Sequence, residues 1–470
     1  MPRPPTLFNF PQSSAYQPAR WAEAAFEVWQ GTYLSADGIE RAAQRRTAVL
    51  INYARAASPF YARLYRKLPT NARLHDLPSV GKRALMDRFD EVVTQPGVTR
   101  RAVEEFTADR GRIGHLMLGR FGVWTSSGTT GTPGYFVHDA HAMAVYDALE
   151  AQRFRALFSP TDVIRQLMDG DRYAMVAATD GHFAGVSSVE RMRHWAPWMA
   201  NAVRSFSLLQ PAEQLLNELN AYRPTILATY PTAAEMLAEQ QEAGQLRLRP
   251  REIWTGGEVL SEPTRQRVQR AFDCRVRSAY GASEFLPIGW ECPHRQLHVN
   301  SDWVVLEPVD RHGGPVAPGA RSHSVWLTNL ANRVQPLIRY DLGDAVTLHT
   351  DPCACGSRFP VISVEGRCDD TLRLPGRHGG EVVCVPLALE TVLEEGAGAH
   401  EFQLVQRADG ALTVHLAAQE RSRRGPVRAA LRRYFDTCDV GPVEILMSRR
   451  GPVREPGSGK LRRVVCRLPR

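Results

Sequence analysis

The chain has 470 residues, of which 43% are hydrophobic and 23% are charged. These proportions exclude wholesale disorder, and the length allows two or three domains. The net charge of +8 is small for this length, and the basic residues near the C-terminus lack an interleaved aromatic pattern or a nucleic-acid-binding motif. We therefore expect no nucleic-acid partner; an anionic small substrate explains the charge more simply.

The sequence also bears on the compartment. No apolar run approaches the ~20 residues that a membrane span needs, and the N-terminal residues lack the apolar core of a signal peptide. Eight cysteines in so long a chain do not form a disulfide scaffold and are expected to be thiols or metal ligands. We expect a cytoplasmic protein without a membrane partner.

Helical spacing of tryptophan, alanine and leucine predicts mostly helix from about residue 20 to 110, with one break at 58–61. Helices and strands then alternate to about residue 260. The expected helices are 140–158, 212–222 and 232–243, and the expected strands are 173–178, 225–229 and 252–254. Strands that alternate with helices predict a parallel, layered α/β sheet.

The remainder divides into two parts. Short strands with Gly/Pro turns predict a β-rich subdomain over about 290–364. Beyond it, strands at 402–405, 412–417 and 443–448 and a helix at 427–438 predict a small α+β unit. The predicted fold class is α/β, with a large N-terminal domain of layered α/β sheets and the β-rich subdomain over 1–366, and a small C-terminal domain over 367–470.

Residues 125–134 contain only Gly, Pro, Ser and Thr and lie between two apolar runs. Such residues favour turns, so a loop between strands is expected. Its backbone N–H groups and hydroxyls suit a polyphosphate, although the Gly-x-x-x-x-Gly-Lys-Ser/Thr spacing is absent. The alternative is a flexible linker.

Further segments decide between these alternatives. In chain order they are Gly256-Gly-Glu258, Tyr280-Gly-Ala-Ser-Glu284, Arg339-Tyr-Asp-Leu-Gly-Asp344, Gly366-Arg-Cys-Asp-Asp370 and Gly457-Ser-Gly-Lys460. Together with the loop they resemble the adenylate-forming superfamily of acyl-CoA ligases, firefly luciferases and nonribosomal adenylation domains. The closer resemblance is to the phenylacetate–coenzyme A ligase family, whose N-terminal pattern is similar to residues 57–61 and 76–79 followed by Lys82.

The resemblance implies a two-step reaction. A carboxylate attacks the α-phosphate of ATP, giving an acyl-adenylate and pyrophosphate, and a thiol or amine then displaces AMP. It also implies Mg²⁺, coenzyme A as acceptor, and an aromatic carboxylic acid as substrate. The C-terminal domain is expected to be a mobile lid.

The same resemblance assigns catalytic roles to three residues. Glu284 is expected to hold Mg²⁺, Arg367 to pair with phosphate oxygens, and Lys460 to stabilise charge in the first step. Without the other motifs, Lys460 is a solvated lysine in a basic tail. Asp369 matches the hinge about which the C-terminal domain turns.

The ATP site is expected to consist of the loop and of the later motifs. Tyr280 offers a flat face to adenine, and Asp344 is expected to accept hydrogen bonds from both ribose hydroxyls. The full set is Thr125, Ser126, Ser127, Gly128, Thr129, Thr130, Gly131, Gly256, Gly257, Glu258, Ala279, Tyr280, Gly281, Ser283 and Asp344. Thr132 stands where the superfamily usually has a lysine, which weakens ATP binding unless another base compensates.

The acid site is expected at residues 177–185 and 228–232. His182, Phe183 and Tyr230, with Gly281, offer flat walls with polar tips that suit an aromatic acid. The alternative for Phe183 and Tyr230 is an ordinary core position, and Tyr230 precedes a proline that shapes a turn.

Cys292, His298, Cys353 and Cys355 predict a closed, structural Cys₃His zinc site, with His294 as the alternative imidazole. Some members of the phenylacetate–coenzyme A ligase family carry a similar set. The alternative is ordinary buried thiols and a surface histidine.

The main hypothesis is an ATP-dependent, AMP-forming ligase of an aromatic acid with coenzyme A. Transfer to a carrier protein or an amine is the first alternative, and a non-catalytic nucleotide-binding regulator the second. Glu284, Asp344, Arg367 and Lys460 together argue against the regulator. The identity of the acid stays open, as does the oligomeric state, with a homodimer among the options.

Overall fold

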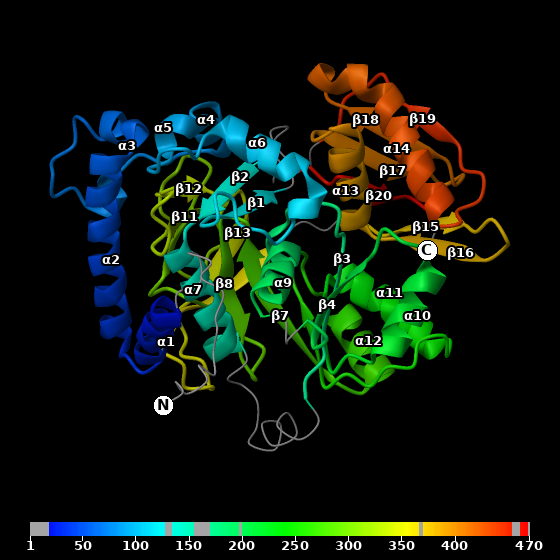
Figure 1. Ribbon diagram of the computed structural model, residues 1–470, viewed down its shortest axis with the longest axis horizontal. Coiled ribbons are helices and arrows are strands. Elements are labelled where there is room, and N and C mark those ends of the chain that lie inside the picture. The colour runs from blue at the N-terminus through cyan, green and yellow to red at the C-terminus, as the bar shows by residue number, and fades with distance from the viewer. Residues whose placement is uncertain are drawn as a thin grey trace, which may run out of the picture.

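The computed structural model describes residues 18–126, 134–154, 170–196, 200–365, 370–453 and 461–468. The N-terminal helices lie along one side of the molecule, the strands form its centre, and the C-terminal domain lies at the opposite upper corner (Figure 1). The fold class is confirmed as α/β, with a large N-terminal and a smaller C-terminal domain.

The N-terminal region is helical, as predicted. Its helices are α1 (Pro18–Thr32), α2 (Ala36–Ala57), α3 (Pro59–Leu64), α4 (Lys82–Asp87), α5 (Phe89–Val92) and α6 (Arg100–Ala108). The buried residues of α2 recur every three or four positions, which gives the helix one apolar face. Ser58 ends α2, and its hydroxyl accepts a hydrogen bond from the backbone N–H of Tyr61 at the start of α3. This cap explains the break predicted at 58–61.

A nine-stranded sheet forms the centre of the molecule, in the order β13-β14-β9-β8-β7-β6-β5-β3-β4. Strands β4, β3, β5, β6 and β7 are parallel, and the rest are antiparallel. The parallel strands are β3 (Tyr173–Ala177), β4 (Val203–Ser207), β5 (Ile226–Thr229), β6 (Glu252–Thr255) and β7 (Arg275–Ala282). Their carboxyl ends lie at one edge of the sheet, where α/β proteins usually bind ligands.

Helices connect these strands. They are α7 (Ala140–Leu149), which continues as a π-helical turn to Phe154, α9 (Ala184–Trp195), α10 (Ala212–Tyr222), α11 (Pro231–Glu242) and α12 (Glu262–Phe272). The prediction for 212–222 agrees with α10 at both ends. Strand β7 continues to Ala282, because its carboxyl end pairs with β8 (Phe285–Glu291).

The predicted β-rich region divides between two sheets. Strands β10 (Val304–Val309), β11 (Ser324–Asn329) and β12 (Tyr340–Asp341) form a separate three-stranded sheet. Strands β9 (Leu297–Val299), β13 (Ala345–His349) and β14 (Val361–Glu365) instead extend the large sheet, because β9 pairs with β8 on one side and with β14 on the other. Strands β1 (Gly122–Ser126) and β2 (Gly134–His138) form a hairpin.

The C-terminal domain is built on a four-stranded sheet in the order β19-β18-β17-β20. Its elements are β15 (Leu372–Pro375), β16 (Glu381–Cys384), α13 (Pro386–Ala397), β17 (Phe402–Gln406), β18 (Leu412–Leu416), α14 (Arg424–Thr437), β19 (Ile445–Met447) and β20 (Val464–Cys466). One buried hydrophobic cluster includes residues of this domain and of the parallel half of the large sheet, so the two domains pack against each other. Among the described residues, no helix has the length and apolar composition that crossing a membrane requires.

Candidate functional site

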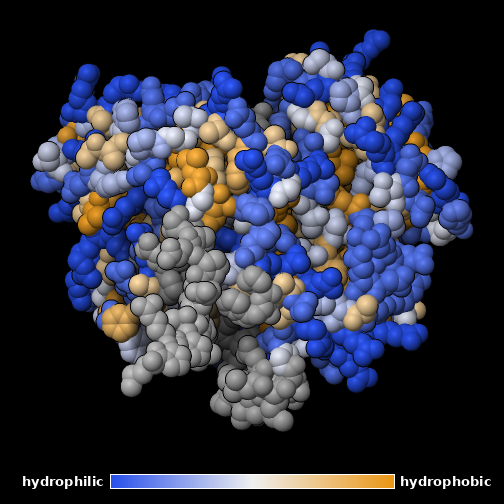
Figure 2. Space-filling model, in the orientation of Figure 1, coloured by the Kyte–Doolittle hydropathy of each residue, from blue (hydrophilic) through white to orange (hydrophobic). Residues whose placement is uncertain are grey.

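A cavity of about 1280 Å³ opens at the carboxyl ends of the parallel strands. Its walls include the turn after β6, the end of β7 and the residues before β13. Leu387 and Thr391 of α13 and Leu461 add a wall from the C-terminal domain. On the face shown in Figure 2 the surface is mostly hydrophilic, and hydrophobic residues gather in its upper half. The cavity thus needs both domains to be complete.

The base of the predicted phosphate loop borders this cavity. Ser126 ends β1 and pairs with Gly134 at the start of β2, so the loop does connect two strands. The residues expected to hold phosphates, Ser127, Gly128, Thr129, Thr130 and Gly131, lie outside the described residues, as does Thr132.

Lys82 stands at the base of this loop and lines the cavity. Its Nζ donates a hydrogen bond to Oγ of Ser126 at 3.0 Å. A Cβ at Gly134 would lie 2.5 Å from that Oγ and 2.7 Å from Cε of Lys82, so glycine leaves room for the pair. From the sequence, Lys82 contributed only to the family resemblance. No local pattern could place it beside Ser126, which lies 44 positions away.

Hydrogen bonds join the loop base to two other predicted segments. The backbone N–H of Thr125 donates to the carbonyl of His182 at 2.8 Å. The hydroxyl of Ser283 donates to the carbonyl of Thr125 at 2.9 Å. The structure therefore brings the base of the loop, the acid-site segment and the Tyr280–Glu284 motif together.

Glu284 is buried at the cavity wall. Burial raises the pKa of its carboxyl, and this is partly offset by the positive charge of Lys82 and a hydrogen bond from Tyr340. A buried carboxylate beside a polyphosphate site is a hard oxygen ligand of the kind that Mg²⁺ takes. The carboxylate of Glu284 therefore fits the Mg²⁺ ion assigned to it.

A buried polar network fixes the turn that carries Glu284. Burial lowers the pKa of His138 to about 3, so the ring is neutral; its Nε2 lies 3.0 Å from the carbonyl of Ser283 and its Nδ1 3.2 Å from the hydroxyl of Tyr146. Asn329 donates to the Glu284 carbonyl at 2.9 Å and to the same hydroxyl at 2.8 Å. These bonds satisfy groups that would be costly to bury alone.

Tyr280 and Asp344 meet at the cavity. Burial raises the pKa of Tyr280 well above its ordinary value of 10.0, so its hydroxyl stays protonated and donates to Asp344 at 2.9 Å. Gly281 lies at an irregularity in the β7–β8 pairing, where a Cβ would come within 2.0 Å of the Leu286 carbonyl oxygen. Only glycine fits this turn, which explains its place in the motif.

The Gly256–Glu258 turn borders the cavity, as does Ala279. Gly257 has φ +80°, a conformation that favours glycine. The carboxylate of Glu258 accepts hydrogen bonds from the N–H and the hydroxyl of Thr232, each at 3.0 Å, at the start of α11. In this structure Glu258 caps a helix while lying at the cavity wall.

The predicted acid-site residues divide. Phe183 and Tyr230 line the cavity, as does Gly281, whereas His182 is not among the described lining residues. The His182 imidazole lies 3.2 Å from the Asp109 carbonyl oxygen and packs against Phe106.

The cavity wall near Phe183 has further apolar members that the sequence analysis missed. These are Tyr173, Met175, Val186, Val189 and Met192 of β3 and α9. Their spacing is that of ordinary core positions, so no sequence signal separates them from the core.

Arg367, Asp369 and Lys460 lie outside the described residues. Leu461, the residue after Lys460, is buried and lines the cavity.

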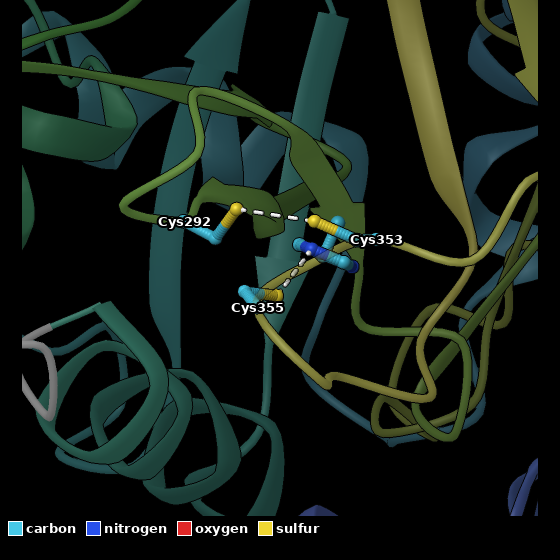
Figure 3. A group of neighbouring side chains, drawn as sticks. Cys292, Cys353 and Cys355 are labelled. Carbon is cyan, nitrogen blue, oxygen red and sulfur yellow. Dashed lines mark hydrogen bonds between the residues drawn. The ribbon is translucent and has the colours of Figure 1, made fainter.

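The four residues of the predicted metal site converge: Cys292 follows β8, His298 lies in β9, and Cys353 and Cys355 lie between β13 and β14. Their ligand atoms all lie within 4.8 Å of one another. Figure 3 shows the side chains of Cys292, Cys353 and Cys355. The sulfurs of Cys292 and Cys353 lie 3.6 Å apart, and that of Cys355 lies 3.3 Å from Nε2 of His298. Zn–S bonds of ~2.3 Å in a tetrahedron place two sulfurs ~3.8 Å apart, so the set fits zinc.

His298 is the histidine of this group. Its Nδ1 lies 2.9 Å from the Phe359 carbonyl oxygen, which orients Nε2 toward the thiols. His294, the alternative, is exposed and is not part of the group.

Comparisons with known proteins agree with this geometry. Residues 122–321 match the family model of the AMP-binding enzymes. A segment of 138 residues is 28% identical to protein CapK of Staphylococcus aureus and spans 29% of this chain and 29% of that protein.

Similar solved structures extend the comparison to both domains. One is a 2-hydroxyisobutyryl-CoA ligase in complex with 2-HIB-AMP and CoA, with TM-score 0.58 and 20% identity over 93% of this chain and 91% of that chain. An open conformation of the same ligase gives TM-score 0.56 and 19% identity over 98% and 95%. Residues 122–321 thus match the AMP-binding enzymes, and the chain has, across both domains, the fold of this acyl-CoA ligase.

Proposed function

We propose that this protein uses ATP to activate a carboxylic acid and then transfers the acyl group to coenzyme A. In the first step a carboxylate oxygen attacks the α-phosphorus and pyrophosphate leaves. In the second, the thiol sulfur attacks the acyl carbon, AMP leaves, and the thiol proton passes to solvent. One observation carries the proposal: Lys82, Ser126, Glu284 and the Tyr280–Asp344 pair all border one cavity.

Each of these groups has a role in the first step. Ser126 and Lys82 would donate hydrogen bonds to phosphate oxygens, and Lys82 would supply the positive charge that Thr132 does not. Asp344 would accept hydrogen bonds from the ribose, with Tyr280 orienting it. Glu284 would hold Mg²⁺, which neutralises charge on the phosphates. Arg367 and Lys460 complete the set as the resemblance implies.

The acid is proposed to be aromatic. Phe183 and Tyr230 line the cavity beside apolar residues of β3 and α9, and flat rings stack favourably with aromatic substrates. An acid similar to phenylacetate is the first candidate, following the family resemblance.

Coenzyme A is the proposed acceptor, because the similar solved ligase is described with an adenylate and CoA. A carrier protein or an amine is the alternative acceptor, and each would meet the same cavity. Asp369 is proposed as the hinge between residues 1–366 and 367–470.

We further propose that Cys292, His298, Cys353 and Cys355 hold a structural zinc ion. Support comes from the convergence of three thiols and one oriented imidazole, which fill all four positions of a closed site.

ATP–pyrophosphate exchange over a panel of aromatic and aliphatic acids tests the function. We expect exchange with at least one aromatic acid. Exchange with aliphatic acids alone would contradict the proposed substrate class, and no exchange with any acid would favour a nucleotide-binding regulator. Product analysis with coenzyme A, a carrier protein or amines then identifies the acceptor.

A further inference from the structure

Arg463 is completely buried in the C-terminal domain, between two carboxylates of α13. Its Nη1 donates to Glu390 and its Nη2 to Glu394, both of them buried. Nη2 also donates to the carbonyl of His400 at 3.0 Å, and the guanidinium lies 4.4 Å from the centre of the Phe402 ring. The planar fork of arginine reaches two carboxylates at once, which a lysine ammonium cannot do in the same geometry.

Packing alone does not require this arrangement. A buried ion pair is costly to desolvate, and apolar residues of similar volume often replace one without loss of stability. The trio of Arg463, Glu390 and Glu394 places three ionisable side chains inside a domain that has an ample apolar core. A specific geometry, rather than stability, is therefore the better explanation.

The position of the trio indicates what it fixes. Glu390 and Glu394 line the main cavity, as does Leu461, two residues before Arg463. The Arg463 carbonyl accepts from the N–H of Leu404 in β17 at 2.7 Å, so backbone and side chain are both anchored.

A second set of contacts holds the same segment. Arg462 forms an ion pair with Asp370 at 2.7 Å, and the N–H of Cys466 donates to that carboxylate at 2.8 Å. Asp370 directly follows the proposed hinge residue Asp369. The chain after Lys460 is thus tied both to the cavity wall and to Asp370.

We propose that Arg463 is a positioning residue for the first step, holding the chain that follows Lys460 against the cavity wall formed by α13. This inference rests on the proposed function. Because Arg463 acts through the chain that carries Lys460, and Lys460 is assigned to the first step only, Arg463 should affect adenylate formation and not acyl transfer.

The test separates the two steps in the full-length protein. Arg463→Lys is compared with the wild type in ATP–pyrophosphate exchange and in thioester formation from synthetic acyl-adenylate and coenzyme A. We expect exchange to fall about 10²-fold, the effect of an ~1 Å misplacement, with ATP affinity and thioester formation nearly unchanged. Equal loss in both steps would overturn the inference.

Two further variants separate positioning from stability. Glu420→Ala removes a buried carboxylate of the same domain that caps the N–H groups of His400 and Glu401, and it should lower stability without separating the steps. The triple variant Arg463→Met, Glu390→Gln, Glu394→Gln removes the buried charges. It should fold yet keep the exchange defect, whereas recovered exchange would show a purely structural role. A wild-type protein without exchange activity would refute the proposed function and this inference together.

Discussion

The main cavity and the Cys/His cluster (Cys292, His298, Cys353 and Cys355) are assembled in different ways. The cluster takes its four donors from two short segments of one domain, and the donors lie within 4.8 Å of one another. The cavity takes its groups from segments between Lys82 and Leu461 and from both domains. The Cys/His cluster is therefore complete within one domain, whereas the main cavity depends on how the two domains pack against each other.

The difference separates stability from chemistry. Three thiols and an imidazole fill the four coordination positions of a tetrahedral ion and leave no position for substrate. The cluster is therefore expected to fix β8, β9 and the loop between β13 and β14. The cavity keeps its carboxylates and hydroxyls at a surface that a ligand reaches. Changes to the cavity should alter rates, and changes to the cluster should alter stability.

The largest effect is expected from Lys460→Ala. Removing the charge assigned to the first step should lower ATP–pyrophosphate exchange by about 10³-fold, the upper range for a single electrostatic group. ATP binding, measured by calorimetry, should stay nearly the same. Unchanged exchange would contradict the role of Lys460.

Lys82→Met tests the charge at the loop base. Loss of the ammonium beside Ser126 should lower exchange by about 10²-fold and weaken ATP binding, because phosphate charge loses a partner. Thr132→Lys restores the usual loop lysine and should rescue much of this loss in the double variant, with little effect alone. If Thr132→Lys changes exchange equally in the wild type and in Lys82→Met, Lys82 does not compensate for the missing loop lysine.

Cys355→Ser should break the cluster without changing the chemistry. We expect loss of bound zinc and about 3 kcal/mol of unfolding free energy, the scale for removing a tightly bound ligand. The ratio of the two half-reaction rates should not change below the melting temperature. Cys274→Ser, a thiol outside the cluster, is the control and should keep its zinc. Zinc-free wild-type protein, purified without chelator, would refute the site.

The smallest effect is a pH dependence from Glu284. Burial raises its pKa above the ordinary 4.5, so the carboxylate that would hold Mg²⁺ is lost as pH falls through the raised value. As the pH is lowered, the exchange rate should therefore begin to fall before the pH reaches 4.5. The sign is opposite for stability: the folded state binds this proton more tightly, so its contribution is present at low pH and is lost as pH rises through the raised pKa.

The variant Glu284→Gln tests both the pH dependence of exchange and the pH dependence of stability. It should lower exchange and remove this contribution to the pH dependence of unfolding, measured by denaturant titration at several pH values. If the residual exchange activity of Glu284→Gln still falls at the same acidic pH as that of the wild type, another group is responsible for the pH dependence.

Local patterns predicted much of the fold. The bounds of α10 and the hairpin around the phosphate loop depend on residues close in sequence, whose spacing sets periodicity and turns. The pairing of β9 with β14 was not predicted, because it joins segments about 60 residues apart that could equally have closed a separate sheet.

The sequence by itself determined which chemical groups this protein carries and in what order, because each motif is a short run whose residue types suit one task. Tertiary structure alone decided where those groups point. It placed Lys82 beside Ser126, turned His182 toward Asp109, chose His298 over His294, and set α13 as a cavity wall. The physical reason is that such contacts follow from packing and burial between distant segments, which no local pattern records.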